Sequence, residues 1–229
     1  MRTAHPTEGQ PAVQRSHPHI KNLSDLLAYE AELDSSICGI SLANDGETRL
    51  AVQGAHDPTP SPYFVLEQLL AHLDLTDQSH LLDVGSGTGR VMAYFLYRGF
   101  AGQATGIELD PDLASATRAW TASHPNLHML QGSVLDIDLS PYTDFYLFNP
   151  FAPHVLQRFI PALEEQLTHP CTLIHMSDNG DTWQYVGRSG WTELASGSFQ
   201  YYRTDRGQNI EVYDCPQHYT IWRYEPNDR

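Results

Sequence analysis

The stretch HLLDVGSGTGR at residues 80–90 decides the fold of this chain. Its apolar first half is typical of a short buried strand, and a glycine turn leads from it into the apolar, helix-like run VMAYFLYRGF at 91–100. Three glycines at alternate positions, Gly85, Gly87 and Gly89, let the backbone turn tightly and approach a ligand closely, because no Cβ stands in the way. A strand, a glycine turn and a helix in this order predict a nucleotide-type binding site.

The glycine spacing separates two classes of cofactor. A dinucleotide fingerprint has its third glycine three residues after the second, and Arg90 holds that position here, which disfavours an NAD-dependent oxidoreductase. The run from Asp83 to Gly89 instead resembles motif I of the class I S-adenosylmethionine-dependent methyltransferases. The resemblance implies S-adenosylmethionine as cofactor, with Asp83 near its methionine moiety. It also implies a glycine loop under the methionine and ribose, made of Gly85, Ser86, Gly87 and Gly89.

A second apolar strand, in QATGIELDPDL, ends at Glu108, nineteen residues after Gly89. A carboxylate at this position can accept hydrogen bonds from both ribose hydroxyls of a nucleoside. We therefore predict Glu108 as the ribose ligand, with Leu109 beside it in the cofactor site. Asp110 and Pro111 have the residue types of an N-cap and a first helical residue, so the next helix is expected to begin there.

The third and fourth strands predict the rest of the site, since ligands of open α/β sheets lie beyond the carboxyl ends of the strands. LHMLQ at 127–131 leads to Ser133 and Val134, which we place in the cofactor site. Many class I methyltransferases carry an Asp after the preceding glycine, where it holds the adenine amino group. Ser133 takes that place here, and Asp136 is the alternative adenine ligand.

The fourth strand, DFYLFN, runs into Asn149-Pro150-Phe151, which we predict to be the catalytic residues. The segment resembles the Asn-Pro-Pro-aromatic motif of amino methyltransferases, although one proline is missing. In that motif the Asn side-chain and backbone carbonyls accept hydrogen bonds from the target amine, and the aromatic ring packs on it. Asn149 is also expected to contact the cofactor.

Alternating strands and helices predict an α/β fold, a doubly wound and mostly parallel seven-stranded sheet with an antiparallel C-terminal hairpin. We expect a disordered tail at 1–20 and one methyltransferase domain at 21–229, with a helical cap region at 21–75 and a catalytic core at 78–229. Within it, the helix of SPYFVLEQLLAHLDL is expected to begin with Ser61 as N-cap, residues 46–54 to be extended, and 201–217 to be a long loop in the acceptor pocket.

Composition limits the partners and the location. No apolar run is long enough for a membrane span and no secretory signal is evident, so we expect a cytoplasmic protein. The twelve histidines show no paired metal-ligand spacing, and no metal is expected. A formal net charge of −15 argues against a nucleic-acid substrate. The one local exception would be a convergence of Arg188, Arg203 and Arg206.

The region from Tyr63 to Ser177 is similar to a group of small, mostly uncharacterised bacterial class I methyltransferases, in its elements LLDVGSGTGR, GIEL and FNPF. The predicted function is S-adenosylmethionine-dependent methyl transfer to a nucleophile, with nitrogen favoured, on a small molecule or a protein side chain. Two alternatives stay open: a noncatalytic or regulatory S-adenosylmethionine-binding protein, and an NAD-dependent oxidoreductase. The residues leave the acceptor and the oligomeric state undetermined.

Overall fold

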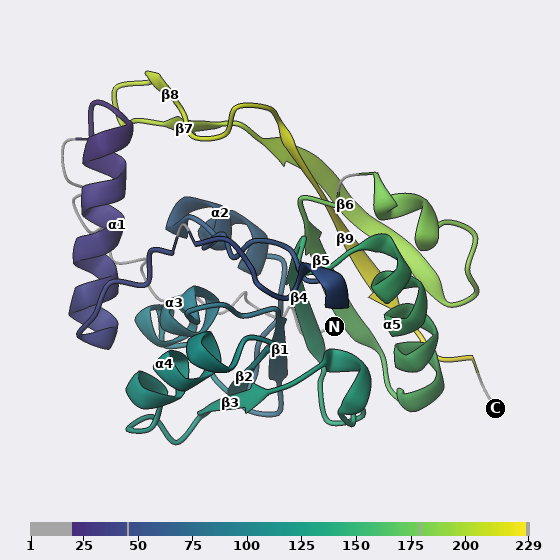
Figure 1. Cartoon of the computed structure of the whole chain (residues 1–229). Helices are drawn as coiled ribbons and strands as arrows, with labels where there is room; N and C mark the ends of the chain where they lie inside the picture. The colour runs from purple at the N-terminus through teal and green to yellow at the C-terminus, as the bar shows by residue number, and fades with distance from the viewer. Residues whose placement is uncertain (1–19, 45, 179, 228–229) are drawn as a thin grey trace, which may run out of the picture.

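The structure is a computed structural model, and it describes residues 20–44, 46–178 and 180–227. Seven strands form one sheet in the order β3-β2-β1-β4-β5-β9-β6 (Figure 1). The first five are parallel, and β9 is antiparallel to both β5 and β6. The predicted doubly wound sheet with an antiparallel C-terminal hairpin is confirmed. The strands are β1 His80–Val84, β2 Gln103–Glu108, β3 Leu127–Gln131, β4 Asp144–Phe148, β5 Cys171–Met176, β6 Trp191–Phe199 and β9 Gln217–Tyr224.

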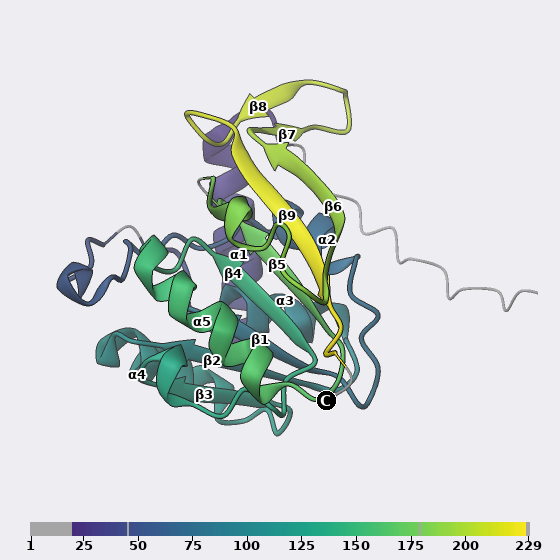
Figure 2. The same ribbon diagram turned by 90° about the vertical axis from the view of Figure 1, so that its right-hand side faces the viewer.

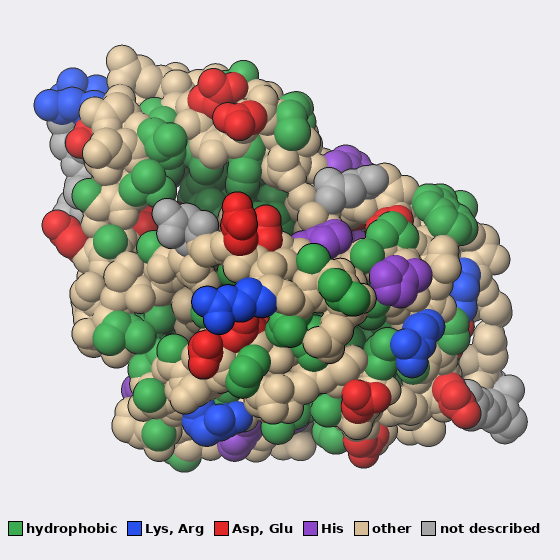
Figure 3. Space-filling view, in the orientation of Figure 1, with side chains coloured by type: hydrophobic (Ala, Val, Ile, Leu, Met, Phe, Trp, Pro, Cys, Tyr) green, Lys and Arg blue, Asp and Glu red, His purple; other side chains and the backbone are tan. Residues whose placement is uncertain are grey.

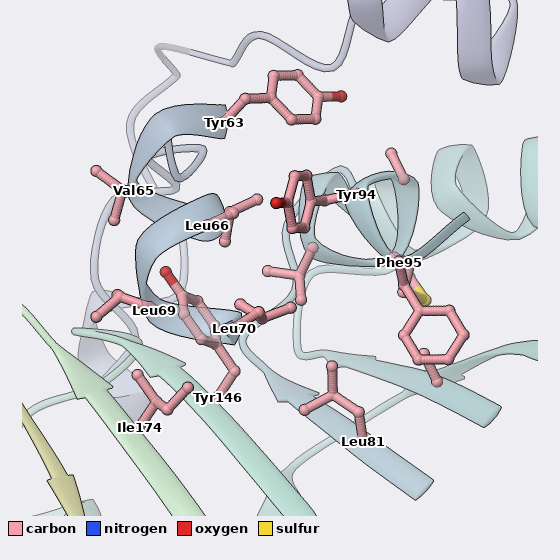
Figure 4. Close-up of a cluster of buried hydrophobic side chains, with 14 of the residues drawn as sticks. Tyr63, Val65, Leu66, Leu69, Leu70, Leu81, Tyr94, Phe95, Tyr146 and Ile174 are labelled. Atoms are coloured by element: carbon pink, nitrogen blue, oxygen red, sulfur yellow. The ribbon is translucent and has the colours of Figure 1, made fainter. Parts of the chain in front are cut away.

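Helices cover both faces of the sheet. Neighbouring residues of a strand point to opposite faces, so each strand contributes side chains to both cores. Leu81 belongs to the core under α2, α3 and α4, whereas Leu82 belongs to the core under α5. Figure 4 shows the first core, where side chains of α2 and α3 point toward Leu81, Tyr146 and Ile174 of the sheet. The helices are α1 Leu23–Cys38, α2 Tyr63–Leu70, α3 Arg90–Arg98, α4 Pro111–Thr121 and α5 Pro153–Gln166, with short 3-10 turns η1 Ala51–Gln53, η2 Val134–Asp136 and η3 Asp181–Gln184.

The start of α4 agrees with the sequence prediction. Asp110 is the N-cap, its side chain accepts hydrogen bonds from the backbone of Asp112 and Leu113, and Pro111 opens the helix. The start of α2 does not agree, because its N-cap is Pro62, which has no capping side chain. The Ser61 hydroxyl instead lies 2.7 Å from the Tyr146 hydroxyl in the interior. The Tyr63 backbone N–H at the start of α2 donates to Glu30 of α1, at 2.8 Å.

Buried charges hold α1 against the first turn of α3. Arg90 places two guanidinium nitrogens on Asp34, at 3.2 and 2.7 Å, and a third on Glu30, at 3.1 Å. The Tyr63 hydroxyl and the Leu42 backbone N–H also donate to Asp34. Burial raises the pKa of Glu30, and the charge of Arg90 works against this rise. Because the two acids are four residues apart on α1, one face of the helix presents both carboxylates to Arg90.

Two further segments differ from expectation. Residues 46–54, expected to be extended, contain the turn η1. The stretch 201–217 is no open loop, since strands β7 Tyr201–Arg203 and β8 Asn209–Glu211 pair in it. This small hairpin extends from the β6 and β9 ends over α1 (Figures 1 and 2). Its Ile210 is buried with Leu26 of α1 because alternate residues of β8 point inward.

The predicted tail at 1–20 lies outside the described residues, except for Ile20, which is buried with Leu26. In the part of the chain that the structure describes, no helix is long and apolar enough to cross a membrane. The division into a cap region at 21–75 and a core at 78–229 stays a prediction.

Replacing Asp34 tests the buried charges. Asp34→Ala leaves Arg90 with one carboxylate and leaves the Tyr63 hydroxyl without its acceptor, so we expect a loss of about 3 kcal/mol or more in the free energy of unfolding. Urea unfolding measures the loss. Glu32→Ala is the matched control, because Glu32 is an exposed acid on the same helix, and its change should stay within about 0.5 kcal/mol. Equal stability of the two variants would contradict the assignment.

Candidate active site

A cavity of about 280 Å³ lies beyond the carboxyl ends of β1, β2 and β4. Its walls are formed by residues 85–88 of the glycine loop, by residues 132–134 and 148–151, and by residues from the segment 107–113 and from the segment 46–60, which we call the strap. Figure 3 shows acidic side chains on both sides of a basic one at the centre of the face that the strap crosses in Figure 1. Four acids and one arginine of this wall are exposed at its rim: Glu47, Asp57, Asp110 (partly), Asp112 and Arg49.

The glycine loop is built against the predicted catalytic segment. Gly85 has a φ of 71°, and a Cβ at this position would lie 2.5 Å from the Cβ of Pro150. Gly87 has a φ of 52°, and the nearest atom to a Cβ at this position would be the Cβ of Pro58 in the strap, at 4.0 Å. Gly85 therefore serves close packing, whereas a side chain at Gly87 would enter the space between the loop and the strap.

Glu108, the predicted ribose ligand, lines the cavity and holds the glycine loop. One carboxylate oxygen accepts from the Gly87 backbone N–H at 2.8 Å, and the other accepts from the Asp110 N–H at 2.9 Å. The side chain is half-buried, and Leu109 lines the cavity beside it. The carboxylate therefore connects the loop after β1 to the start of α4, and each of its oxygens keeps a further lone pair that can accept a hydrogen bond.

Asp83 is a buried carboxyl group at the floor of the cavity. It is 3% exposed, and its Oδ2 is buried with no hydrogen-bond partner. Burial raises its pKa well above the usual range, and the nearby charge of Glu108 raises it further. A cationic ligand in the cavity would relieve both effects. The sulfonium and ammonium groups of S-adenosylmethionine supply such a charge, so this donor set fits the cofactor.

Ser86, Ser133 and Val134 also line the cavity. The predicted cofactor residue Gly89 is absent from the described cavity wall and packs against α4 instead, where a Cβ would lie 2.8 Å from Thr117. The Ser133 hydroxyl accepts from the Leu135 N–H at 3.2 Å and keeps its own proton to donate. Val134 is buried beside it, and Ser86 contacts the sulfur of Met129. Asp136, the alternative adenine ligand, is exposed and absent from the described cavity wall.

Asn149 has a strained backbone conformation. Its backbone and side-chain carbonyl oxygens both contact the same residue, His56. The φ of Asn149 is 41°, in the left-handed region, and its N–H donates to Met176 of β5. The imidazole Nδ1 of His56 lies 2.9 Å from the Asn149 backbone oxygen and 3.0 Å from its side-chain Oδ1. Pro150 accepts from the His56 backbone N–H, and Phe151 pairs with Ala55. Asn149, Pro150 and Phe151 thus share the cavity wall with the strap.

The sequence analysis missed His56 and assigned no role to Arg90. His56 lies in the run AHDPTPSP, which has neither strand nor helix periodicity, and a single histidine there carries no spacing signal. Arg90 was considered only as a departure from a glycine pattern, although it too lines the cavity. Both residues act through partners more than 50 positions away along the chain.

The geometry also bears on the stretch 201–217 and on the three arginines. The stretch 201–217 contributes no residue to the described cavity wall, so its placement in the acceptor pocket is wrong. The arginines do not converge: Arg188 pairs with Glu164 of α5, whereas Arg203 belongs to the β7–β8 hairpin over α1. Among the described residues, no group of three or more His, Cys, Asp or Glu side chains could hold a metal ion.

Comparisons with known proteins show which families this chain resembles. Residues 62–170 match the family model of ribosomal RNA adenine dimethylase. A ribosomal RNA small subunit methyltransferase A of Geobacter sulfurreducens is 31% identical over 75 residues, which is 33% of this chain and 26% of the relative. The chain therefore spans about a quarter of the length of this curated relative.

Solved structures show the same fold. An RNA methyltransferase from Salinibacter ruber in complex with S-adenosyl-L-homocysteine has a TM-score of 0.51 at 24% identity, over 75% of this chain and 95% of that one. A putative RNA methyltransferase from Pyrococcus horikoshii has a TM-score of 0.57 at 14% identity, over 86% and 98%.

These matches overturn one prediction. The net charge argued against a nucleic-acid substrate, but the matched family and the curated relative are methyltransferases of ribosomal RNA. The argument was wrong because net charge sums over all groups, including acids that are paired in the interior. Glu30 and Asp34, for example, form buried ion pairs with Arg90.

The sheet order, the glycine loop with Glu108 and the family match over 62–170 point in the same direction. The chain has the fold of the class I S-adenosylmethionine-dependent methyltransferases, and its residues 62–170 match a methyltransferase family.

Proposed function

We propose that this protein transfers a methyl group from S-adenosylmethionine to an amino nitrogen of a nucleobase in RNA. The observation that carries the proposal is the pair of Asn149 carbonyl oxygens, which converge on a single nitrogen at the cavity wall. The family match to ribosomal RNA adenine dimethylase supports RNA as the substrate class and adenine as the base. The segment FNPF supports an amine as the acceptor by its resemblance to the Asn-Pro-Pro-aromatic motif.

Each residue has a role that follows from its place. When bound, S-adenosylmethionine supplies an electrophilic methyl group on a sulfonium. Asp83 provides the negative charge that balances this cation, and Glu108 holds the glycine loop and accepts from the ribose. Asn149 accepts hydrogen bonds from the amine and so directs the nitrogen lone pair at the methyl group. Pro150 and Phe151 keep this segment in place against Gly85 and Ala55.

The acidic rim favours entry of a base over entry of a phosphate. Glu47 and Asp57 would repel the RNA backbone at the cavity mouth, whereas an uncharged base pays no such cost. A nucleotide turned out of its stack, with only its base in the cavity, satisfies both conditions. Arg49 at the same rim is placed to contact a flanking phosphate.

Cofactor binding is tested by thermal unfolding. S-adenosylmethionine at about 100 times its dissociation constant should stabilise the protein by roughly 2.7 kcal/mol, whereas NAD should have no effect. Glu108→Ala should remove most of the rise in melting temperature. Asp112→Ala, an acid of the same cavity wall outside the loop contacts, should keep it. Stabilisation by NAD alone would contradict the proposal.

The charge of Asp83 is tested by pH. Because the folded-state pKa of this carboxyl is raised, its ionisation removes stability from the unliganded protein as pH rises above the unfolded pKa of about 4. Asp83→Asn lacks this loss, so the variant should gain unfolding free energy relative to the wild type as pH increases. Cofactor affinity should fall at the same time. Urea unfolding from pH 4 to pH 8 and calorimetry measure the two effects, and a pH-independent difference would contradict them.

The acceptor is tested with labelled cofactor. Transfer of the labelled methyl group into unmodified ribosomal RNA transcripts, followed by digestion to nucleosides, should give methylated adenosine. Asn149→Ala should lower the rate on the order of 10²-fold with nearly unchanged cofactor affinity, because its contact is made to the aligned acceptor. Asn126→Ala, at the opposite end of the sheet before β3, is the control.

Two results would overturn this assignment. Label that enters only protein or small molecules would exclude RNA as the substrate. Cofactor binding with no labelled product in any cell fraction would favour a noncatalytic S-adenosylmethionine-binding protein.

A further inference from the structure

His56 occupies the place that the proposed function gives to the acceptor nitrogen. Its Nδ1 lies within hydrogen-bond distance of both carbonyl oxygens of Asn149, at 2.9 and 3.0 Å. Both partners are acceptors, so Nδ1 carries the proton and donates it to the two oxygens. A half-buried histidine of the strap thus satisfies the same pair of oxygens that an amine substrate needs.

The strap is held in register with Asn149 by backbone contacts. Ala152 donates to the Gly54 carbonyl at 2.7 Å, and His56 donates to the Pro150 carbonyl at 3.2 Å. Gly54 is buried with a φ of 86°, and a Cβ there would lie 2.9 Å from Val155 of α5. These contacts do not involve the imidazole. Rotation of the His56 side chain therefore vacates the nitrogen position without separating the strap from the wall.

The number of available protons decides which acceptor replaces the imidazole. One N–H of His56 is shared between two oxygens, so each receives a weak, bifurcated hydrogen bond. A primary amine offers two N–H groups, one for each oxygen, and gains a hydrogen bond by the exchange. A secondary amine, a ring N–H or a hydroxyl has a single proton and gains none.

We propose that His56 is a specificity-determining residue, an internal stand-in for the acceptor that only a primary amine displaces. The proposal rests on the proposed role of Asn149 as the holder of the acceptor. It also deepens that role, because an amine that has received one methyl group retains one N–H and loses its advantage over His56. The product of the wild-type protein is therefore the monomethylated amine, and His56 limits a second transfer. The matched family is named for a dimethylase, so on this point the chain is inferred to differ from that family.

Calorimetry on the protein saturated with S-adenosylhomocysteine tests the proposal, with adenosine and N6-methyladenosine as probes. The wild type should prefer adenosine, and His56→Ala should reduce this preference by about fivefold, the value of one net hydrogen bond. His154→Ala is the matched control, because this exposed histidine lies against Gly54 of the strap and has no contact with Asn149 among those described. It should keep the wild-type preference.

A double variant separates the two proposals. In an Asn149→Ala background, His56→Ala should have no effect on the preference, because the oxygen pair is gone. An unchanged preference in His56→Ala alone would overturn the role of His56. Equal adenosine affinity of Asn149→Ala and the wild type, or no adenosine binding in any variant, would overturn the proposed function instead.

Free imidazole gives a readout that does not depend on the acceptor. It should bind His56→Ala, where the position between the two oxygens is vacated, and it should bind neither the wild type nor the double variant. NMR titration with imidazole, following the Asn149 side-chain amide, measures this. Failure of imidazole to bind His56→Ala would overturn the proposal.

Discussion

The guanidinium of Arg90 is the point where the N-terminal helices meet the cofactor loop. A buried arginine is costly unless its charge is paired and its donors are satisfied, and here Glu30 and Asp34 do both. Arg90 is the first residue of α3, directly after Gly89, so its position fixes the exit of the glycine loop. The same two acids accept from the backbone N–H groups of Tyr63 and Leu42, which places α2 and the segment that precedes the strap. One cluster of charges therefore orders the whole approach to the cavity.

A second constraint connects the cofactor side to the acceptor side. Gly85 has no room for a Cβ because Pro150 lies against it, so the glycine loop, the proposed cofactor site, and the segment 149–151, the proposed acceptor site, share a contact surface. Pro150 and Phe151 in turn pair with His56 and Ala55 of the strap. Since methyl transfer depends on the relative placement of donor and acceptor, direct packing of the two segments is an economical way to fix it.

The sequence predicted the parts of the protein that depend on local pattern. The strands, the glycine loop and the N-cap at Asp110 follow from periodicity and residue type over a few positions. The Arg90 cluster could not be predicted, because Glu30 and Asp34 look like the solvent face of a helix until Arg90 is brought to them from 56 positions away. Ser61 has the residue type of an N-cap, but the buried Tyr146 hydroxyl competes for it. The pairing of His56 with Asn149 spans 93 positions and carries no local signal at all.

The net charge of the chain is likewise a poor guide to its substrate. A net charge of −15 predicts repulsion of a polyanion at long range, and salt screens such repulsion beyond about 10 Å. What a substrate meets is the local arrangement: Asp83 and Glu108 line the cavity, Glu30 and Asp34 are paired with Arg90 in the interior, and the rim acids stand at the mouth. By the proposed function, the rim acids repel phosphates from the cavity and leave an uncharged base free to enter it. An acidic methyltransferase and an RNA substrate are therefore compatible when recognition lies in the base and its amino group.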